Sequence, residues 1–501
     1  MTVKSVVELG FLERFLGTAI EHPDLPALRL LDDPPEGRSS WTYGEFLELI
    51  ERYRWAFEHL GVQPGDAVAL VLPTGVDLAA CVYALPSLGA IFTPIHPKLT
   101  AREMRLVLED LGPAGIVSTA AVAEAHADIL LAGQGSPRFL LSVDDAPAGK
   151  LRVEALGALP PGSSSLVAPD GNPLVSCHYT YKGLGYPLGV AHRYRSYASC
   201  VAGMERNFPD AKRGVHLASL PFHSIYGLTA EILAPLSGEN EVLITERVLD
   251  ILDALERYRA TLACVVPIVL RRMISSARAR AEAGRPVQLN PRLRIASGGS
   301  YMDAALAAEA EEVLRVEVHQ GYGLTETLPV AGTRPRKNKH GSLGLPFSKE
   351  IETTVVDSDG REVDAGVAGQ IVVRGPTLLD SFWKRPAETE RFLRNGWFQT
   401  GDLGFKDEDG FLFFLGRSGG VTKVAALMVD LAEVEAVLAE HPAVAQARVT
   451  VGQREELGEW LTAWVLLRQA AEASENHLRL HCRQALSTHK IPREFRICTR
   501  S

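Results

Sequence analysis

Short apolar runs alternate with segments of helical periodicity along the first part of the chain, and this alternation restricts the fold more than any other feature. Residues 67–72 form an apolar run that ends at Pro73, and residues 76–88 then repeat apolar side chains at helical spacing. Strands that alternate with helices form parallel sheets wrapped by helices. We therefore predict an α/β fold. Further segments of this pattern are the strands at 90–95 and 115–118 and the helix at 100–111, which a capping box of Thr100 and Glu103 opens.

The character of the chain changes after residue 417, where a glycine-containing hinge begins. Residues 418–420 are Ser-Gly-Gly, and Gly419 should leave the hinge unusually free. We predict a large N-terminal domain of helix-wrapped sheets over residues 1–417 and a small, mobile α/β domain over residues 418–501, hinged near residues 416–420. The segments predicted in the small domain are strands at 444–451 and 460–467 and helices that run from Asp430 to Leu438 and from Asn476 to Ser487.

Composition and charge exclude several classes of partner. Of the 501 residues, 46% are hydrophobic, which suits a substantial core, and the formal charge of −9 argues against a nucleic-acid partner or an anionic membrane surface. No uninterrupted apolar stretch reaches the ~18 residues of a membrane span. The six cysteines are scattered without a C-x-x-C pair, which is typical of reduced, mostly buried thiols. We therefore expect a soluble, cytoplasmic protein.

A series of short motifs follows in a fixed order past the middle of the chain. Residues 320–327 read QGYGLTET, in which the glycines let the backbone approach a ligand, Tyr322 offers a stacking face and Thr325 can donate to a phosphate oxygen. Alone, a Gly-Tyr-Gly turn is more often only a turn. A buried carboxylate such as Asp402 suits two vicinal hydroxyls. The companions of this turn are residues 220–227 (LPFHSIYG), 297–300 (SGGS), 369–376 (GQIVVRGP), 397–403 (WFQTGDL) and 414–417 (FLGR).

This ordered set resembles the superfamily of adenylate-forming enzymes, which includes acyl- and aryl-CoA synthetases, peptide-synthetase adenylation domains and luciferases. The resemblance runs from about residue 42 to the C-terminus. It implies that Tyr322 stacks on adenine, that Thr325 holds the α-phosphate, and that Asp402 and Arg417 bind the ribose. It also places Gly298, Gly299 and Gly323 at the nucleotide, His223, Tyr226 and Gly323 in the acyl pocket, Lys423 and Ala426 at the pantetheine arm of CoA, and Glu326 at a magnesium ion. Without the order of the motifs, His223 would be expected to be a satisfied core histidine.

The phosphate loop departs from the pattern of the superfamily. That loop is rich in Ser, Thr and Gly, so that backbone N–H groups converge on the β- and γ-phosphates, and it carries a lysine just before its final glycine. The matching residues 180–189 read TYKGLGYPLG. Tyr181 and Lys182 stand beside Gly183 where the superfamily has small residues, and Leu188 stands in place of the lysine. Lys182 could reach a phosphate from its shifted place.

A second departure lies at the C-terminal end of the sequence. Residues 490–496 (KIPREFR) resemble a segment that precedes a Pro-x-x-Gly-Lys turn in the superfamily, and the sequence ends at Ser501 before such a turn. The lysine of that turn bridges the carboxylate and the α-phosphate during adenylation, and such a cation is worth ~10²–10³ in rate. Lys490 and Lys423 remain as candidate substitutes.

Both departures affect the adenylation half-reaction and spare the thioester half-reaction. Our main hypothesis is therefore an acyl-CoA:carrier-protein acyltransferase of adenylate-forming fold, which moves an aryl group (benzoate- or aminobenzoate-like) or a short acyl group from CoA to a carrier-protein pantetheine. It would use a CoA thioester, with AMP if an adenylate forms, and Mg²⁺ only if adenylation is retained. One alternative is an ATP-dependent aryl or acyl acid:CoA ligase, in which Lys182 and another lysine compensate. A third hypothesis is a catalytically silent sensor of acyl-CoA or nucleotide. No residue is assigned a catalytic role from the sequence.

Overall fold

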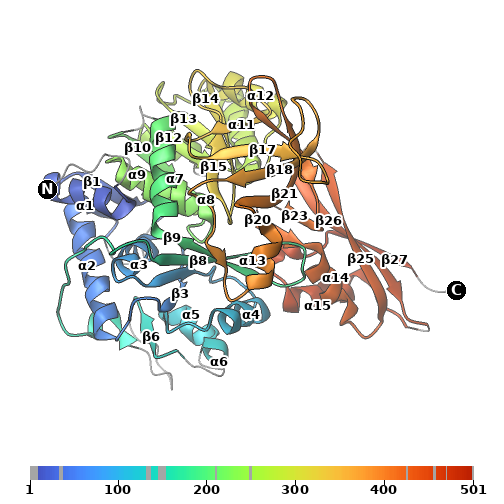
Figure 1. The fold of residues 1–501 in the computed structure, drawn as a ribbon, viewed down its shortest axis with the longest axis horizontal. Helices are drawn as coiled ribbons and strands as arrows, with labels where there is room; N and C mark the ends of the chain where they lie inside the picture. The colour runs from blue at the N-terminus through green and yellow to red at the C-terminus, as the bar shows by residue number, and fades with distance from the viewer. Residues whose placement is uncertain are drawn as a thin grey trace.

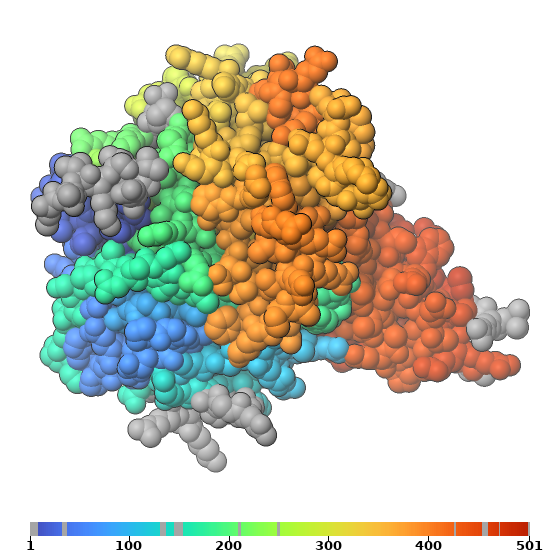
Figure 2. All heavy atoms as spheres, in the orientation of Figure 1, coloured from blue at the N-terminus to red at the C-terminus, as the bar shows by residue number. Residues whose placement is uncertain are grey.

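The computed structural model of the protein describes residues 9–32, 38–130, 137–144, 154–208, 212–247, 251–424, 427–454, 458–469 and 471–498. Within these residues the strands form two large sheets and two small ones. The large sheets belong to a large N-terminal domain, and the small ones belong to a smaller C-terminal domain, which projects from one side of it in Figures 1 and 2. The predicted division into a large and a small α/β domain is confirmed, and the exact hinge position stays a prediction.

The first large sheet is mostly parallel. One edge of the sheet is antiparallel, because β8 and β9 form a hairpin whose turn is the phosphate loop. In sheet order its strands are β19 (Ser381–Phe382), β9 (Leu188–Arg193), β8 (Leu174–Thr180), β4 (Ile91–Pro94), β3 (Ala67–Val71), β5 (Gly115–Ser118), β6 (Phe139–Ser142) and β7 (Glu154–Ala155).

The second large sheet changes direction along β14 (Glu317–Leu324). Gln320 pairs in parallel with Ser297, and the next residue, Gly321, pairs antiparallel with Gly332. The predicted nucleotide motif thus lies where the parallel part of the sheet meets its antiparallel part. The remaining strands in sheet order are β17 (Glu352–Val356), β18 (Gly369–Arg374), β21 (Trp397–Lys406), β22 (Leu412–Arg417), β16 (Ser342–Pro346) and β15 (Leu328–Gly332) on one side of β14. On its other side lie β13 (Arg294–Ser297), β12 (Leu262–Val265), β10 (Val215–Ala218), β11 (Glu241–Ile244), β1 (Pro26–Leu30) and β2 (Ser40–Thr42), while β20 (Leu393–Arg394) pairs with β21.

Helices cover the faces of both sheets, and α7 lies between them, in contact with β9 and β15 (Figure 1). An aromatic cluster holds the helices of the first sheet, with Phe15 and Tyr83 ring centroids 4.9 Å apart. The helices of the large domain are α1 (Phe11–Glu21), α2 (Tyr43–His59), α3 (Val76–Ser87), α4 (Ala101–Leu111), α5 (Ala120–Ala125), α6 (Ala127–Leu130), α7 (Tyr194–Asn207), α8 (Ile225–Leu228), α9 (Ala234–Ser237), α10 (Ile251–Arg257), α11 (Pro267–Glu282), α12 (Ala304–Leu314) and α13 (Pro386–Phe392).

The small domain has its own apolar core, in which α14 packs on its three-stranded sheet. It begins with a hairpin that turns back toward the large domain. Its elements are the hairpin β23 (Val421–Val424) and β24 (Leu427–Asp430), the helices α14 (Leu431–Ala439) and α15 (Glu475–Ala485), and the sheet of β25 (Val444–Arg454), β26 (Gly458–Leu467) and β27 (Glu494–Cys498).

Several local predictions are confirmed. The strand at 115–118 has the expected bounds, and α4 opens with the capping box of Thr100 and Glu103. Asp430 caps α14 through Ala432 N. All six cysteines are free, and Cys498 alone among them is exposed. Among the helices of the described residues, none is long and apolar enough to cross a membrane.

Candidate functional site

The antiparallel part of the second sheet brings three predicted nucleotide residues together. Asp402 on β21 and Arg417 on β22 are register partners, and Arg417 Nε lies 3.0 Å from Asp402 Oδ1. The hydroxyl of Tyr322 donates to Asp402 Oδ2 over 2.9 Å. Burial and the neighbouring Asp402 carboxylate raise the pKa of Tyr322 well above its usual value, so the phenol stays a donor. The carboxylate is therefore held in place by a phenol and a guanidinium.

Two cavities meet around these residues. The larger has a volume of about 710 Å³ and the smaller about 420 Å³. Thr325 and Lys423 line both, so a ligand could extend from one cavity into the other. The predicted residues that line the larger cavity are His223, Tyr226, Gly298, Gly299, Tyr322 and Gly323. Those that line the smaller one are Lys182, Gly183, Glu326, Asp402 and Arg417, and Tyr181 lines both.

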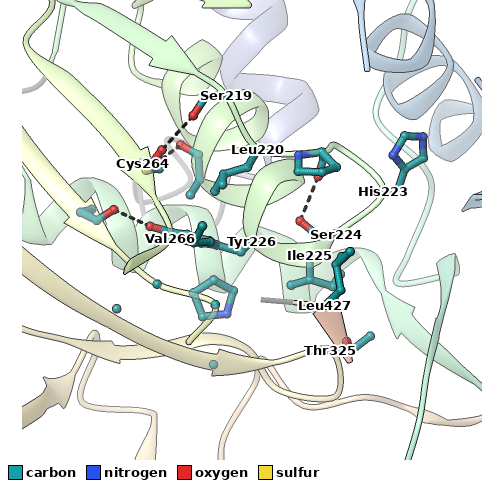
Figure 3. Close-up of a pocket in the computed structure, with 18 of the residues that line it drawn as sticks. Ser219, Leu220, His223, Ser224, Ile225, Tyr226, Cys264, Val266, Thr325 and Leu427 are labelled. Carbon is teal, nitrogen blue, oxygen red and sulfur yellow. Dashed lines mark hydrogen bonds between the residues drawn. The ribbon is translucent and has the colours of Figure 1, made fainter. Parts of the chain in front are cut away.

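The larger cavity contains the predicted acyl pocket, which Figure 3 shows. Tyr226 comes from α8, and its hydroxyl donates to the carbonyl of Ala296 over 2.8 Å. Its ring lies so close to Gly298 that a Cβ there would be 2.7 Å from Tyr226 Cζ. A glycine at position 298 is therefore needed for the tyrosine to lie flat along this wall. Ser219, Leu220, Cys264 and Val266 continue the lining.

His223 is both a core histidine and a lining residue. Its Nε2 lies 2.6 Å from the carbonyl oxygen of Leu72, which requires that Nε2 carry the proton. Burial and the neighbouring His96, whose ring centroid is 4.8 Å away, lower the pKa of His223 to about 4. The imidazole is therefore neutral near pH 7. Its Nδ1 has no hydrogen-bond partner among the described residues, so it is available as an acceptor.

The phosphate loop is covered by the small domain. The N–H of Gly185 donates to Asp430 Oδ2 over 2.9 Å, and the Tyr181 hydroxyl donates to Glu433 over 2.9 Å. Gly183, at φ +76°, lies against the hinge so closely that a Cβ would be 1.9 Å from the carbonyl oxygen of Gly419. One backbone N–H of the kind that would receive a β- or γ-phosphate, that of Gly185, is therefore occupied by the protein itself.

Two predicted site residues lie elsewhere. Leu188 is fully buried at the start of β9 and packs with Phe382 and Phe398. A side chain at this position belongs to the core between β9 and β21, so Leu188 does not line either cavity. Ala426 lies outside the residues that the structure describes.

The chain matches the model of the AMP-binding enzyme family over residues 16–383 and that of the AMP-binding enzyme C-terminal domain over residues 433–501. It belongs to the AMP-binding enzyme family. It is 32% identical over 465 residues to the 2-succinylbenzoate–CoA ligase of Geobacillus kaustophilus (strain HTA426), covering 91% of this chain and 89% of the relative. It is 29% identical to 4-coumarate–CoA ligase-like 9 of Oryza sativa subsp. japonica, covering 92% of this chain and 84% of the relative. The resemblance to adenylate-forming enzymes is thus confirmed.

Solved structures agree on the fold. The amide bond synthetase McbA of Marinactinospora thermotolerans superposes with a TM-score of 0.86 at 24% identity, covering 98% of this chain and 96% of that one. A mutant o-succinylbenzoate CoA synthetase of Bacillus subtilis, bound to a product analogue, superposes with a TM-score of 0.83 at 24% identity. The match covers 97% of this chain and 94% of that one. Both domains are included in these matches.

The small domain of this AMP-binding enzyme places Lys423, on β23, in the site. Lys423 Nζ donates to the carbonyl of Gly299 over 2.5 Å. Burial, followed by the nearby Arg417, lowers the pKa of Lys423 to about 7, against the opposing effect of Asp402 and Glu326. Near neutral pH the amine is thus divided between its charged and neutral forms.

Lys490, the other candidate substitute, is engaged between the domains. Its Nζ lies 2.6 Å from Glu103 Oε1 on α4 and 2.8 Å from Glu433 Oε2 on α14, and it also donates to the Tyr181 hydroxyl over 3.0 Å. The role of Glu103 here was not predicted, because the local pattern identified only its part in the capping box. The pairing joins residues far apart in the sequence, which no spacing rule reveals.

Proposed function

We propose that this AMP-binding enzyme forms and exchanges thioesters of an aryl or short acyl group, and that it works through the thioester half-reaction as an acyltransferase from CoA to a carrier-protein pantetheine. The supporting observation is the position of the small domain. It brings Lys423 to the nucleotide side of the site while Asp430 takes the N–H of Gly185 in the phosphate loop.

The chemistry of such a transfer balances without ATP. The C–S bond of the donor thioester breaks as the acyl carbon bonds to a phosphate oxygen of AMP, and the CoA thiolate takes a proton. The acceptor thiol then loses its proton, bonds to the acyl carbon and releases AMP. Asp402, Arg417 and Thr325 would hold the nucleotide, and Tyr226 and His223 would contact the acyl group. A flat aryl group suits the wall that Tyr226 and Gly298 form.

A second candidate is an ATP-dependent aryl or acyl acid:CoA ligase that works through an acyl adenylate. The names of the relatives favour it, since the relative at 32% identity is a 2-succinylbenzoate–CoA ligase, and at the level of the family it is the better supported of the two. In this version the small domain would have to move away from the phosphate loop before ATP could bind. The contacts that the phosphate loop makes through Gly183, Gly185 and Tyr181 with the hinge and the small domain would then have to break.

ATP–pyrophosphate exchange over a panel of aryl and short-chain acids separates the two candidates. For the transferase we expect no exchange with any acid, together with AMP-stimulated transfer of an aryl group from CoA to pantetheine. Asp402→Asn should reduce that transfer, because the nucleotide loses its carboxylate acceptor. Exchange with any acid in the wild-type protein would establish the ligase instead.

A further inference from the structure

The residue that most changes the phosphate loop, Lys182, places a positive charge inside the smaller cavity. Its side chain is 9% exposed, and its Nζ lies 3.2 Å from Oε1 of Glu326, whose side chain is 2% exposed. The ammonium also donates to the carbonyl of Thr400 on β21 over 3.0 Å. The loop residue is therefore bound to the turn between β14 and β15 and to β21 of the second sheet.

Aromatic rings hold the same ammonium from the side. Lys182 Nζ lies 5.4 Å from the ring centroid of Phe392 and 5.0 Å from that of Phe398. Ring faces at such distances attract a cation, and the attraction is stronger where water is excluded. The carboxylate, the carbonyl and the two rings together fix a charged lysine at one place in the cavity.

This arrangement does not suit a divalent cation at Glu326, where the resemblance places magnesium. Magnesium requires near-octahedral oxygen ligands at about 2.0–2.1 Å and keeps several of its waters. An ammonium 3.2 Å from Oε1 of Glu326 already neutralises the carboxylate and repels a second cation. The other carboxylate of the cavity, Asp402, is engaged by Tyr322 and Arg417. Among the described residues, moreover, no group of three His, Cys, Asp or Glu side chains could hold a metal ion.

We propose that Lys182 is a built-in cation that replaces Mg²⁺ at Glu326, so that the phosphate of AMP binds here without a divalent metal. The charges of the smaller cavity suit a phosphate without a metal ion. Lys182, Arg391 and Arg417 line it, with Lys423 partly charged near pH 7, against only Glu326 and Asp402. The inference rests on the proposed function in taking AMP as the ligand. It holds for the nucleotide site whether or not the acyl group is then transferred.

The test is AMP binding by calorimetry, in EDTA and in Mg²⁺. We expect the wild-type dissociation constant to agree between the two conditions within about twofold, since the metal is not coupled to the nucleotide. Lys182→Met should bind AMP more weakly in EDTA and regain about tenfold when Mg²⁺ is added, because Glu326 is then free to hold the metal. Adding Glu326→Gln to Lys182→Met should remove this response.

Lys339→Met is the matched control, since Lys339, like Lys182, forms an ion pair with a carboxylate (it has two, Asp407 and Asp409) but lies outside both cavities. It should behave as the wild type. Wild-type binding that tightens fivefold or more with Mg²⁺, at the lower edge of typical coupling, would overturn the proposal. A folded Lys182→Met without any metal response would overturn it as well.

If Lys182→Met does not fold, Mn²⁺ replaces the variant as a probe. Electron paramagnetic resonance of wild-type protein with AMP should then show only free Mn²⁺, and an immobilised signal would refute the inference. If the proposed function were wrong but this inference right, AMP would still bind equally well with and without metal, and no acyl group would move between thiols.

Discussion

At the residue scale, Lys423 shows how burial prepares a side chain for chemistry. Its pKa is about 7 in the folded protein and 10.5 for an ordinary lysine. Between these pH values the folded protein has released the Lys423 proton and the unfolded chain still holds it. Stability therefore rises with pH between about 7 and 10.5, and the charged form at lower pH costs stability. The fold keeps a lysine that is expensive to bury, which is typical of functional groups.

We expect the rate of acyl transfer to a thiol to rise as pH increases through about 7, because neutral Lys423 can then accept the thiol proton. Lys423→Arg keeps a cation that cannot deprotonate. It should flatten this inflection and lower the rate by about 10²-fold or more. Transfer rates measured from pH 5.5 to 9 would test this, and an unchanged inflection in the arginine variant would assign the titration to another group.

At the element scale, the β8–β9 turn and the hinge pack backbone against backbone. Gly183 has a positive φ, and its Cα faces the carbonyl of Gly419, which itself has φ +92°. Asp430 joins the small domain to the phosphate loop beside this contact. One oxygen of its carboxylate caps α14, and the other accepts a hydrogen bond from the N–H of Gly185. The hinge residue Gly419 thus takes part in a contact with the phosphate loop.

Gly183→Ala should disrupt this contact. Gly61→Ala is its matched control, with φ +77° against +76° but nothing within 4 Å of the added Cβ. Both variants carry the strain of a positive φ, about 1–3 kcal/mol, so any further effect of Gly183→Ala reports the clash. We expect Gly183→Ala alone to increase the radius of gyration in small-angle X-ray scattering and to slow acyl transfer. Equal behaviour of the two variants would contradict the role of this contact.

At the scale of the whole molecule, a buried ion cluster ties the small domain to α4. Lys490 lies between Glu103 and Glu433, and all three side chains are almost fully buried. Burial would raise the pKa of Glu103, but the charge and hydrogen bond of Lys490 outweigh it and lower that pKa to about 2. The same carboxylates raise the pKa of Lys490 despite its burial. Burial raises the pKa of Glu433 against the opposing effect of Lys490, so it is Glu103 and Lys490 that form a fixed ion pair at neutral pH.

Lys490→Met should destabilise the protein by about 3–5 kcal/mol, because it leaves two buried carboxylates without their cation. The contribution of Glu103 is present above its ordinary pKa of 4.5 and is lost as pH falls through about 2. Thermal unfolding between pH 7 and pH 3 should thus show a smaller difference between variant and wild type at the acid end. The exposed Lys339→Met should change little at any pH, and a similar loss in both variants would argue against a special role for the cluster.

The sequence alone determined the α/β class and the organisation into a large and a small domain, and its ordered motifs pointed to the family. It also placed some of the helices and strands, because strand and helix periods, caps and glycine turns are set by neighbours along the chain. It also identified several of the residues that line the two cavities, since their motifs occur in order. Leu188 shows the limit, because the motif indicated only that a lysine is missing from this position, whereas the structure shows that β9 turns the side chain into the core.

Only the tertiary structure decided which charges meet. The sequence indicated only that Lys182 could reach a phosphate, and the meeting of the two large sheets is what pairs it with Glu326 in the smaller cavity. Lys490 does line the larger cavity, but the position of the small domain holds its ammonium between Glu103 and Glu433. The physical reason is that a buried ammonium must find counter-charges within a few ångströms, and those partners lie far away in the sequence.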